Sequence, residues 1–213
     1  MLQNTKAKLD SMYKLEMQEG IYGLQHQLDG VTTISFEQGT VLATIHREMK
    51  PDVSLEIGMA YGFSTLFILD SMHEHKYGYH IAIDPFQKSL WHGIGIKAVE
   101  QLDFNLRFNM ILDYSVSSIP QLYTYGVRPN YIYIDGDHRF DSVLVDFYLS
   151  HRILSQGGVI IFDDLWMPSI QKVVSFIRSN FSCYSEIQTP VENILCLQKS
   201  QHDHRKWDHF VDF

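Results

Sequence analysis

Short apolar runs alternate along the chain with longer stretches in which apolar residues recur at helical spacing. This alternation is typical of a parallel β-sheet whose strands are joined by helices. The apolar runs are rich in β-branched and aromatic residues and are bounded by turn residues. They are Val53 to Ile57, His80 to Ile83, Asn109 to Leu112, Tyr131 to Ile134 and Val159 to Phe162. The pattern therefore predicts an α/β protein.

The segments on either side of these strands predict further elements. Phe36 to Met49 is amphipathic and predicts a helix, and another helix is expected within the first 17 residues. After the last parallel strand, Ser169 to Arg178 predicts a helix. The segments Cys183 to Gln188 and Ile194 to Gln198 then predict two antiparallel strands joined by a short loop. The expected fold is a mostly parallel, seven-stranded sheet with an antiparallel C-terminal hairpin and helices on both faces.

Composition and charge narrow the classes of function. The 213 residues include 17 Lys or Arg and 25 Asp or Glu, a net charge of −8, which argues against a nucleic-acid partner. No apolar stretch approaches the roughly 20 residues of a membrane-spanning helix, and charged residues interrupt Met1 to Gly20, unlike a signal peptide. We expect a cytoplasmic protein without a membrane partner. Its two cysteines, Cys183 and Cys196, are expected to be small buried hydrophobes rather than a disulfide.

Acidic residues recur at the predicted strand ends. Glu56, Asp84, Asp113, Asp135 and Asp163 are separated by 28, 29, 22 and 28 residues, close to the length of one strand–helix–strand step. The carboxyl ends of parallel strands share one edge of the sheet, where open α/β folds bind ligands. Alternatively, each acid is a turn or helix-capping residue.

A glycine turn follows the first strand. The segment from Leu55 to Thr65 runs from a strand through Gly58 and Gly62 into a helix, and such glycines let a ligand approach the backbone. The spacing of the two glycines departs from the Gly-x-Gly-x-x-Gly pattern of dinucleotide-binding proteins, and the chain has no phosphate-binding loop of the Gly-x-x-x-x-Gly-Lys type. Neither a nicotinamide cofactor nor a nucleoside triphosphate is therefore expected.

Four segments together resemble a known family. Glu56-Ile57-Gly58-x-x-x-Gly62 followed by Ile83-Asp84 resembles the first two motifs of class I S-adenosylmethionine-dependent methyltransferases. The segments from Ile134 to His138 and from Gly157 to Asp164 resemble the later strand ends of the small-molecule O-methyltransferase branch. The resemblance covers about residues 50 to 200. The chain length predicts a single domain over 1–213, for which we expect a helical cap (1–50), a Rossmann-like core (51–200) and a tail (201–213).

The resemblance implies a binding site for S-adenosylmethionine. Gly58 and Gly62 would cradle the amino-acid end and the ribose, Glu56 would steady the loop and the ammonium group, and Asp84 would bind both ribose hydroxyls. Tyr114 and Ser115 would border the adenine. The intervening residues Met59, Ala60, Tyr61 and Ser64, together with Asp135, complete the expected cofactor site. Pro85 to Gly95 is either a flap over this pocket or an ordinary surface loop.

A second group of residues suits the chemistry of the methyl acceptor. Asp135, Asp163 and Asp164 offer hard oxygen ligands that suit Mg²⁺, Mn²⁺ or Ca²⁺, and acidic residues at these places bind a divalent ion in the metal-dependent relatives. Asp137 is a competing ligand. Alternatively, Asp164 caps the following helix and Asp135 contacts only cofactor or water. His138, three positions after Asp135, is expected to take the acceptor's proton.

The expected activity is methyl transfer to a small-molecule acceptor, most simply a hydroxyl oxygen, with possible assistance from the metal. The alternatives are a non-catalytic S-adenosylmethionine-binding module and another metal-dependent small-molecule enzyme on this fold. The candidates for lining the acceptor pocket are Tyr22, His26, Thr33, Phe36 and Trp166. Alternatively, the aromatic residues among them serve the core. The N-terminal helix, with Leu9 and Met12 on one face, either pairs with a second subunit to form a homo-oligomer or packs on its own chain.

Overall fold

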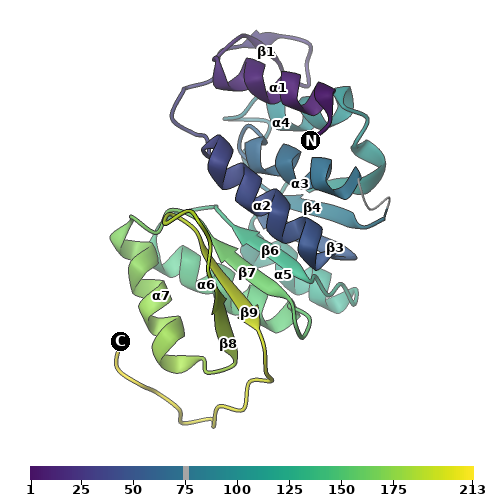
Figure 1. The fold of residues 1–213 in the computed structure, drawn as a ribbon. Coiled ribbons are helices and arrows are strands. Elements are labelled where there is room, and N and C mark those ends of the chain that lie inside the picture. Colours follow the sequence, from purple (N-terminus) through teal and green to yellow (C-terminus); the bar gives the residue numbers. More distant parts are fainter. Residues whose placement is uncertain (74–76) are drawn as a thin grey trace.

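A seven-stranded sheet forms the centre of the structure, a computed structural model that describes residues 1–73 and 77–213 (Figure 1). Five of its strands run parallel. They are β3 (Val53–Ile57), β4 (Tyr79–Ile83), β5 (Phe108–Ile111), β6 (Tyr131–Ile134) and β7 (Val159–Phe162). Each strand matches its predicted run to within one residue at either end. Short β-branched runs bounded by turn residues leave little choice of where a strand begins and ends.

The C-terminal hairpin completes the sheet as expected. Strands β8 (Tyr184–Ile187) and β9 (Leu195–Lys199) pair antiparallel, and β9 also pairs antiparallel with β7. The strand order is β5-β4-β3-β6-β7-β9-β8. Cys183 and Cys196 are both buried and free, which confirms the interpretation of both as small hydrophobes.

Helices cover both faces of the sheet (Figure 1). One face carries α1 (Gln3–Tyr13), α2 (Phe36–Met49), α3 (Phe63–His73) and α4 (Ile94–Gln101). The other face carries α5 (Ser115–Thr124), α6 (Phe140–Ile153) and α7 (Pro168–Asn180). Because successive side chains of a strand point to opposite faces of the sheet, the strands contribute to two separate hydrophobic cores. In β6, for example, Tyr131 and Tyr133 face the first core, and Ile132 and Ile134 face the second.

The N-terminal region packs on its own chain. Leu9 and Met12 of α1 are fully buried, and α1 contacts α3. The sequence did not predict the short hairpin that follows, β1 (Gln18–Glu19) and β2 (Gln25–His26), because two-residue strands carry no periodic signal. A 3₁₀ turn, η1 (Asn105–Arg107), precedes β5. Within the described ranges, none of the helices is both long and apolar enough to cross a membrane.

The strand order places a ligand site beside β3. From β3 the chain passes to β4 and β5 on one side, and it then crosses over to β6 and β7 on the other. In open α/β sheets, such a change of direction opens a crevice at the carboxyl ends of the central strands.

Candidate active site

A cavity of about 1110 Å³ lies at this edge of the sheet. It is larger than the 300–1,000 Å³ typical of pockets for a single small molecule, so it has room for a cofactor and an acceptor together. Its walls come mainly from the residues that follow β3, β4, β5, β6 and β7, and from the loop between β2 and α2. The expected residues among them are Gly58, Met59, Ala60, Tyr61, Ser64, Asp84, Tyr114, Ser115, Asp135, His138, Asp163, Asp164, Thr33 and Trp166.

The glycine turn after β3 needs its glycines for backbone reasons. Gly58 and Gly62 both have φ of +88°, and Ala60 between them has φ of +46°. A Cβ on Gly58 would lie 2.1 Å from the carbonyl oxygen of Asp135, so the ends of β3 and β6 meet here too closely for any side chain. Gly62 does not line the cavity and packs instead against the backbone of Gly95.

Asp84 holds this turn in place. Its Oδ2 accepts hydrogen bonds from the backbone amides of Met59 (3.2 Å) and Ala60 (2.9 Å) and from the side chain of Gln87 (3.1 Å). Its Oδ1 accepts one from the amide of Phe86 (2.7 Å). Groups of the protein therefore use most of the hydrogen-bond-accepting capacity of this carboxylate. Its Oδ1 retains a lone pair that could accept from one ligand hydroxyl.

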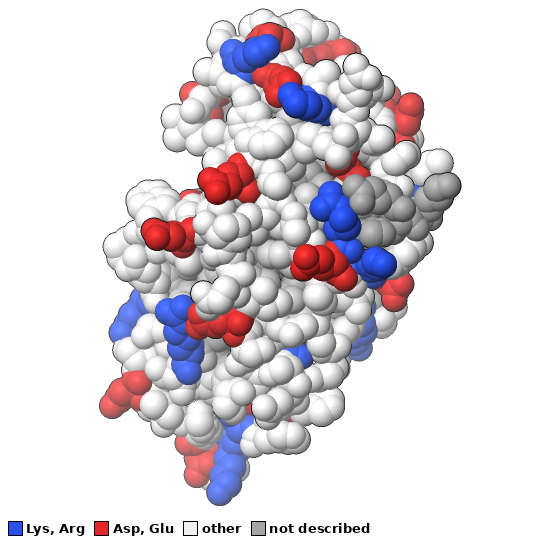
Figure 2. Space-filling model, viewed as in Figure 1, with Lys and Arg blue, Asp and Glu red and all other residues white. Residues whose placement is uncertain are grey.

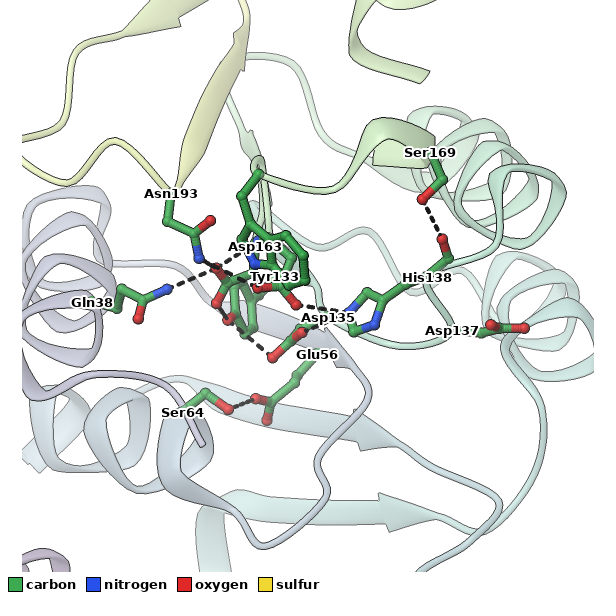
Figure 3. A network of polar contacts seen from close by, with 12 residues as sticks. Gln38, Glu56, Ser64, Tyr133, Asp135, Asp137, His138, Asp163, Ser169 and Asn193 are labelled. Atoms are coloured by element: carbon green, nitrogen blue, oxygen red, sulfur yellow. Dashed lines mark hydrogen bonds and ion pairs between the residues drawn. The ribbon is translucent and has the colours of Figure 1, made fainter. Parts of the chain in front are cut away.

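Glu56 does not face the cavity, contrary to the expectation that it would meet the ammonium group. It is fully buried, and its carboxylate accepts hydrogen bonds from Ser64 and Thr65 in the first turn of α3 and from His80 of β4. Figure 3 shows the contact with Ser64. Glu56 thus anchors the start of α3, and any effect on a ligand passes through the glycine turn.

The far end of the cavity is partly aromatic. Tyr114 and Phe86 meet edge to face, with ring centroids 6.0 Å apart, and Ser115 donates a hydrogen bond to Asp146 of α6. Asp146 was not predicted, because a single acid in an amphipathic helix gives no signal. Burial raises the pKa of Asp146 to about 6, against the opposing effect of Ser115.

Pro85 to Gly95 forms part of the cavity wall. Pro85, Phe86, Leu90 and Trp91 line the cavity, whereas His92 faces away and stacks on His26 with ring centroids 3.9 Å apart. Tyr22, His26 and Phe36, expected in the acceptor pocket, do not line the cavity.

Four donors from the protein hold the carboxylate of Asp163. Its Oδ1 accepts hydrogen bonds from Gln38 (2.8 Å), Asn193 (2.9 Å) and the amide of Asp164 (2.7 Å), and its Oδ2 accepts one from the Tyr133 hydroxyl (2.5 Å). Figure 3 shows these groups converging from three sides. These four donors use most of the accepting capacity of the buried carboxylate, so the expected role of Asp163 as a metal ligand would fall to the one lone pair left on its Oδ2.

Asp135, His138 and Asp164 come together instead. His138 Nε2 lies 3.0 Å from Asp164 Oδ2 and 3.5 Å from Asp135 Oδ1. Among the described residues, these three form the one group whose ligand atoms all lie within 4.8 Å of one another. Asp164 adopts φ of +56°, and its carboxylate accepts from the Trp166 indole, so it does not cap α7, which begins after Met167.

The charges of this cluster are mutually dependent. The carboxylates of Asp135 and then Asp164 raise the pKa of His138 to about 10, and His138 in turn lowers the pKa of Asp164. Burial above all raises the pKa of Asp135 to about 7, with His138 opposing the shift. Both carboxylates therefore favour the protonated form of the His138 ring, whereas the predicted role of base needs its neutral form.

Two other predicted acids lie outside the cluster. Asp137 lines the cavity, but its carboxylate turns toward Arg139 and Ser142 and away from His138 (Figure 3). Asp113 does not line the cavity and accepts a hydrogen bond from the amide of Tyr114. For Asp113, the interpretation as a turn residue describes the structure.

The fold is that of an α/β protein with a large cavity at the carboxyl edge of a mostly parallel sheet. Residues 55–165, more than half of the chain, match the family model described as a methyltransferase domain. The chain belongs to this methyltransferase family. The family and the fold suggested by the sequence motifs are thereby confirmed.

Relatives in the curated proteins and in the solved structures are distant. A segment of 96 residues is 29% identical to the uncharacterized protein R132 of Acanthamoeba polyphaga mimivirus and covers 41% of this chain. The match spans only 39% of that relative.

Several solved methyltransferases share the fold. The SAH-bound methyltransferase PaMTH1 of Podospora anserina superposes with a TM-score of 0.73 at 14% identity, covering 95% of this chain and 89% of that one. The O-methyltransferase of Bacillus cereus, in complex with SAH, gives 0.69 at 18% identity, covering 93% and 92%. TomG, an O-methyltransferase of Streptomyces achromogenes in complex with SAM, gives 0.69 at 15% identity, covering 93% and 90%.

Proposed function

We propose that the chain transfers a methyl group from S-adenosylmethionine to a hydroxyl group of a small molecule. The observation that carries the proposal is one cavity that joins the glycine turn after β3 to the Asp135–His138–Asp164 cluster after β6 and β7. The size of the cavity suits two ligands, and SAM- or SAH-bound methyltransferases share the fold. Residues 1–213 would act as one domain, with the cap contributing Val31 to Ile34 and Gln38 to the cavity wall.

In this proposal the glycine turn and the adjoining residues position the cofactor. The backbone of Gly58 to Tyr61 and the free lone pair of Asp84 Oδ1 would hold its amino-acid and ribose groups, and Tyr114, Ser115 and Asp146 would border its adenine. When bound, S-adenosylmethionine supplies an electrophilic methyl group on a positively charged sulfur. The remaining task of the protein is to align the acceptor oxygen and remove its proton.

Asp135 is the proposed proton acceptor. Asp135 lines the cavity, its Oδ1 lies 3.5 Å from His138 Nε2, and its Oδ2 lies 3.2 Å from the Tyr133 hydroxyl. A hydroxyl bound against Oδ1 would pass its proton to the carboxylate as its oxygen–methyl bond forms and the sulfur–methyl bond of the cofactor breaks, leaving S-adenosylhomocysteine. His138 would stabilise the ionised carboxylates of Asp135 and Asp164 and orient them, rather than accept the proton itself.

A divalent metal fits the same three side chains. Two carboxylates and one imidazole within 4.8 Å could hold Mn²⁺ or a related ion, whereas Mg²⁺ and Ca²⁺ prefer oxygen ligands alone. A metal there would polarise the acceptor oxygen and would require His138 to release its proton.

Transfer of a radiolabelled methyl group tests the proposal. The purified chain is incubated with labelled S-adenosylmethionine and a metabolite extract freed of macromolecules, with and without a chelator. We expect labelled small products with the native chain, at least a hundredfold less with Asp135→Asn, and native levels with Asp113→Asn. Cofactor binding without transfer to any fraction would indicate a non-catalytic binding module. If methyl transfer occurred without the chelator and was lost with it, a divalent metal would be part of the mechanism.

A further inference from the structure

The lining of the cavity is unusually acidic. Seven aspartates contribute to it: Asp84, Asp135, Asp137, Asp141, Asp146, Asp163 and Asp164. Among the described residues that line the cavity, His138 and Arg139 are the only positively charged or chargeable side chains, and no lysine contributes. On the face shown in Figure 2, basic and acidic groups are interspersed, so the excess of acids is a property of the cavity rather than of that whole face.

Both cationic side chains of the lining are already paired. Arg139 donates to Asp137 through Nε at 2.7 Å and through a second nitrogen, and its side chain is 76% exposed. His138 lies between Asp135 and Asp164. An anionic ligand entering the cavity would have to compete with these carboxylates for both cations, and it would face several carboxylates at short range.

The neutral donors of the acceptor side are also engaged. The amides of Gln38 and Asn193 both donate to Asp163, and the Trp166 indole donates to Asp164 Oδ1 at 2.9 Å. The groups that remain for a ligand are mainly carboxylate oxygens, which accept hydrogen bonds, and the ring face of Trp166. Trp166 is 65% exposed. Hydroxyl and ammonium groups match such a wall, and an aromatic face attracts cations.

We propose that the methyl acceptor is a neutral or cationic hydroxy compound, such as an amino sugar or a hydroxylated amine, and that hydroxy compounds carrying a carboxylate or phosphate are excluded. The inference rests on the proposed methyl transfer and adds the charge class of its substrate. A metal ion held by Asp135, His138 and Asp164 would offset part of the negative charge and leave the other acids in excess.

Matched acceptors that differ only in charge provide the first test. Each scaffold is used as an amine, a neutral alcohol and a carboxylate: tyramine, 4-hydroxyphenylethanol and 4-hydroxyphenylacetate, and also glucosamine, glucose and glucuronate. Methylation is measured with labelled S-adenosylmethionine at low salt, with and without a chelator. We expect kcat/KM for the carboxylate to be at least tenfold below that of its amine or neutral counterpart. A carboxylate used as well as its counterparts would overturn the proposal.

Quenching of tryptophan fluorescence tests the charge of the cavity without any acceptor. Trp207 in the tail is 98% exposed, so Trp207→Phe removes its signal, and the emission lost on adding Trp166→Phe isolates Trp166. The Stern–Volmer constant of each ion is divided by that of acrylamide, a neutral quencher. For Trp166 this ratio should be at least threefold larger for caesium than for iodide. Asp164→Asn should narrow this difference and Asp113→Asn should leave it unchanged.

The two tests separate the failure of each proposal. If S-adenosylhomocysteine does not bind, the proposed methyl transfer fails, while the quenching ratio still measures the potential at the cavity mouth. If the cofactor binds and none of the matched acceptors is methylated, the ratio of caesium to iodide quenching alone tests whether the acceptor site excludes anions. Equal quenching by the two ions, or stronger quenching by iodide, would contradict an acceptor site that excludes anions.

Discussion

Single backbone positions decide whether the glycine turn can form. Gly58 and Gly126 both have positive φ, +88° and +77°. A Cβ would meet the backbone of Asp135 at Gly58, whereas at Gly126 it would meet nothing within 4 Å. The pair therefore separates the strain of a positive φ from the cost of a collision.

Alanine substitutions at these two glycines should have different effects. We predict that Gly126→Ala lowers the free energy of unfolding by about 1 kcal/mol, the cost of the backbone conformation alone. Gly58→Ala should lower it by more than about 3 kcal/mol and weaken cofactor binding, because β3 and β6 must separate. Urea unfolding measures both. Equal losses would show that the approach of the two strand ends is not tight.

Asp163 offers a second test at the scale of one residue. Asp163→Asn replaces an accepting oxygen with a donor in a site that holds four donors, so at least one buried donor loses its partner. The expected loss in unfolding free energy is about 2–3 kcal/mol. Asp113→Asn, at the end of β5 and outside the cavity, should change it by less than about 0.5 kcal/mol. A stable Asp163→Asn variant would argue against the hydrogen-bond arrangement described for Asp163.

At the scale of elements, a buried polar chain ties the sheet to two helices. Glu56 of β3 bonds His80 of β4, and His80 Nδ1 lies 2.9 Å from the Ser54 hydroxyl. Ser54 then reaches His46 of α2 at 3.3 Å. Because Glu56 also binds Ser64 and Thr65, this chain fixes the start of α3 relative to the glycine turn.

Glu56→Gln should therefore affect both stability and binding. We predict a loss of about 2 kcal/mol in unfolding free energy, because an amide nitrogen replaces an oxygen among buried donors. We also predict weaker binding of S-adenosylhomocysteine, although Glu56 does not line the cavity. Glu48→Gln, on the exposed side of α2, should alter neither property. If Glu56→Gln reduced stability but left the affinity for S-adenosylhomocysteine unchanged, the position of α3 would not influence the ligand site.

The contact between α6 and the C-terminal tail predicts a pH dependence. Burial, followed by the charge of Lys199, lowers the pKa of His151 to about 4 despite the opposing effect of Asp203. Near pH 6.5 and below, the unfolded chain takes up a proton that the folded chain refuses. The stability contributed by neutral His151 is therefore full above pH 6.5 and is lost as the pH falls toward 4.

The size of this effect can be measured by substitution. Between pH 7.5 and pH 4.5, the native chain should lose of the order of 2 kcal/mol more unfolding free energy than His151→Gln, which has no titrating ring. Other groups titrate alike in both proteins, so the difference isolates His151. Identical pH profiles would mean that the His151 ring is protonated as readily in the folded state as in the unfolded state.

For the whole molecule, local pattern predicted the elements, and long-range contacts decided the roles of side chains. The five parallel strands and the helix from Phe36 to Met49 follow from periodicity and turn residues, which are local properties. The strand-end positions also brought Asp135, His138 and Asp164 together. The sequence could not show that Gln38, 125 positions away, and Asn193 occupy the carboxylate of Asp163.

Two further features depended on packing. Glu56 turns into the core because its neighbours across the sheet and in α3 supply buried donors, and no local signal distinguishes this from a cavity-facing acid. The protonation state of His138 follows from two carboxylates, one of which lies 26 positions along the chain. The role of His138 as the base therefore stays a prediction, and the sequence could not show that two carboxylates flank its ring.

The central claim is that the glycine turn and its neighbours bind S-adenosylmethionine. Calorimetric titration with S-adenosylhomocysteine, on protein stripped of endogenous ligand, tests it most directly. We predict a dissociation constant in the micromolar range, at least tenfold weaker binding for Asp84→Asn, because the carboxylate no longer holds Met59 and Ala60, and native affinity for Asp113→Asn. No binding by the folded native chain, with or without Mg²⁺, would contradict the account.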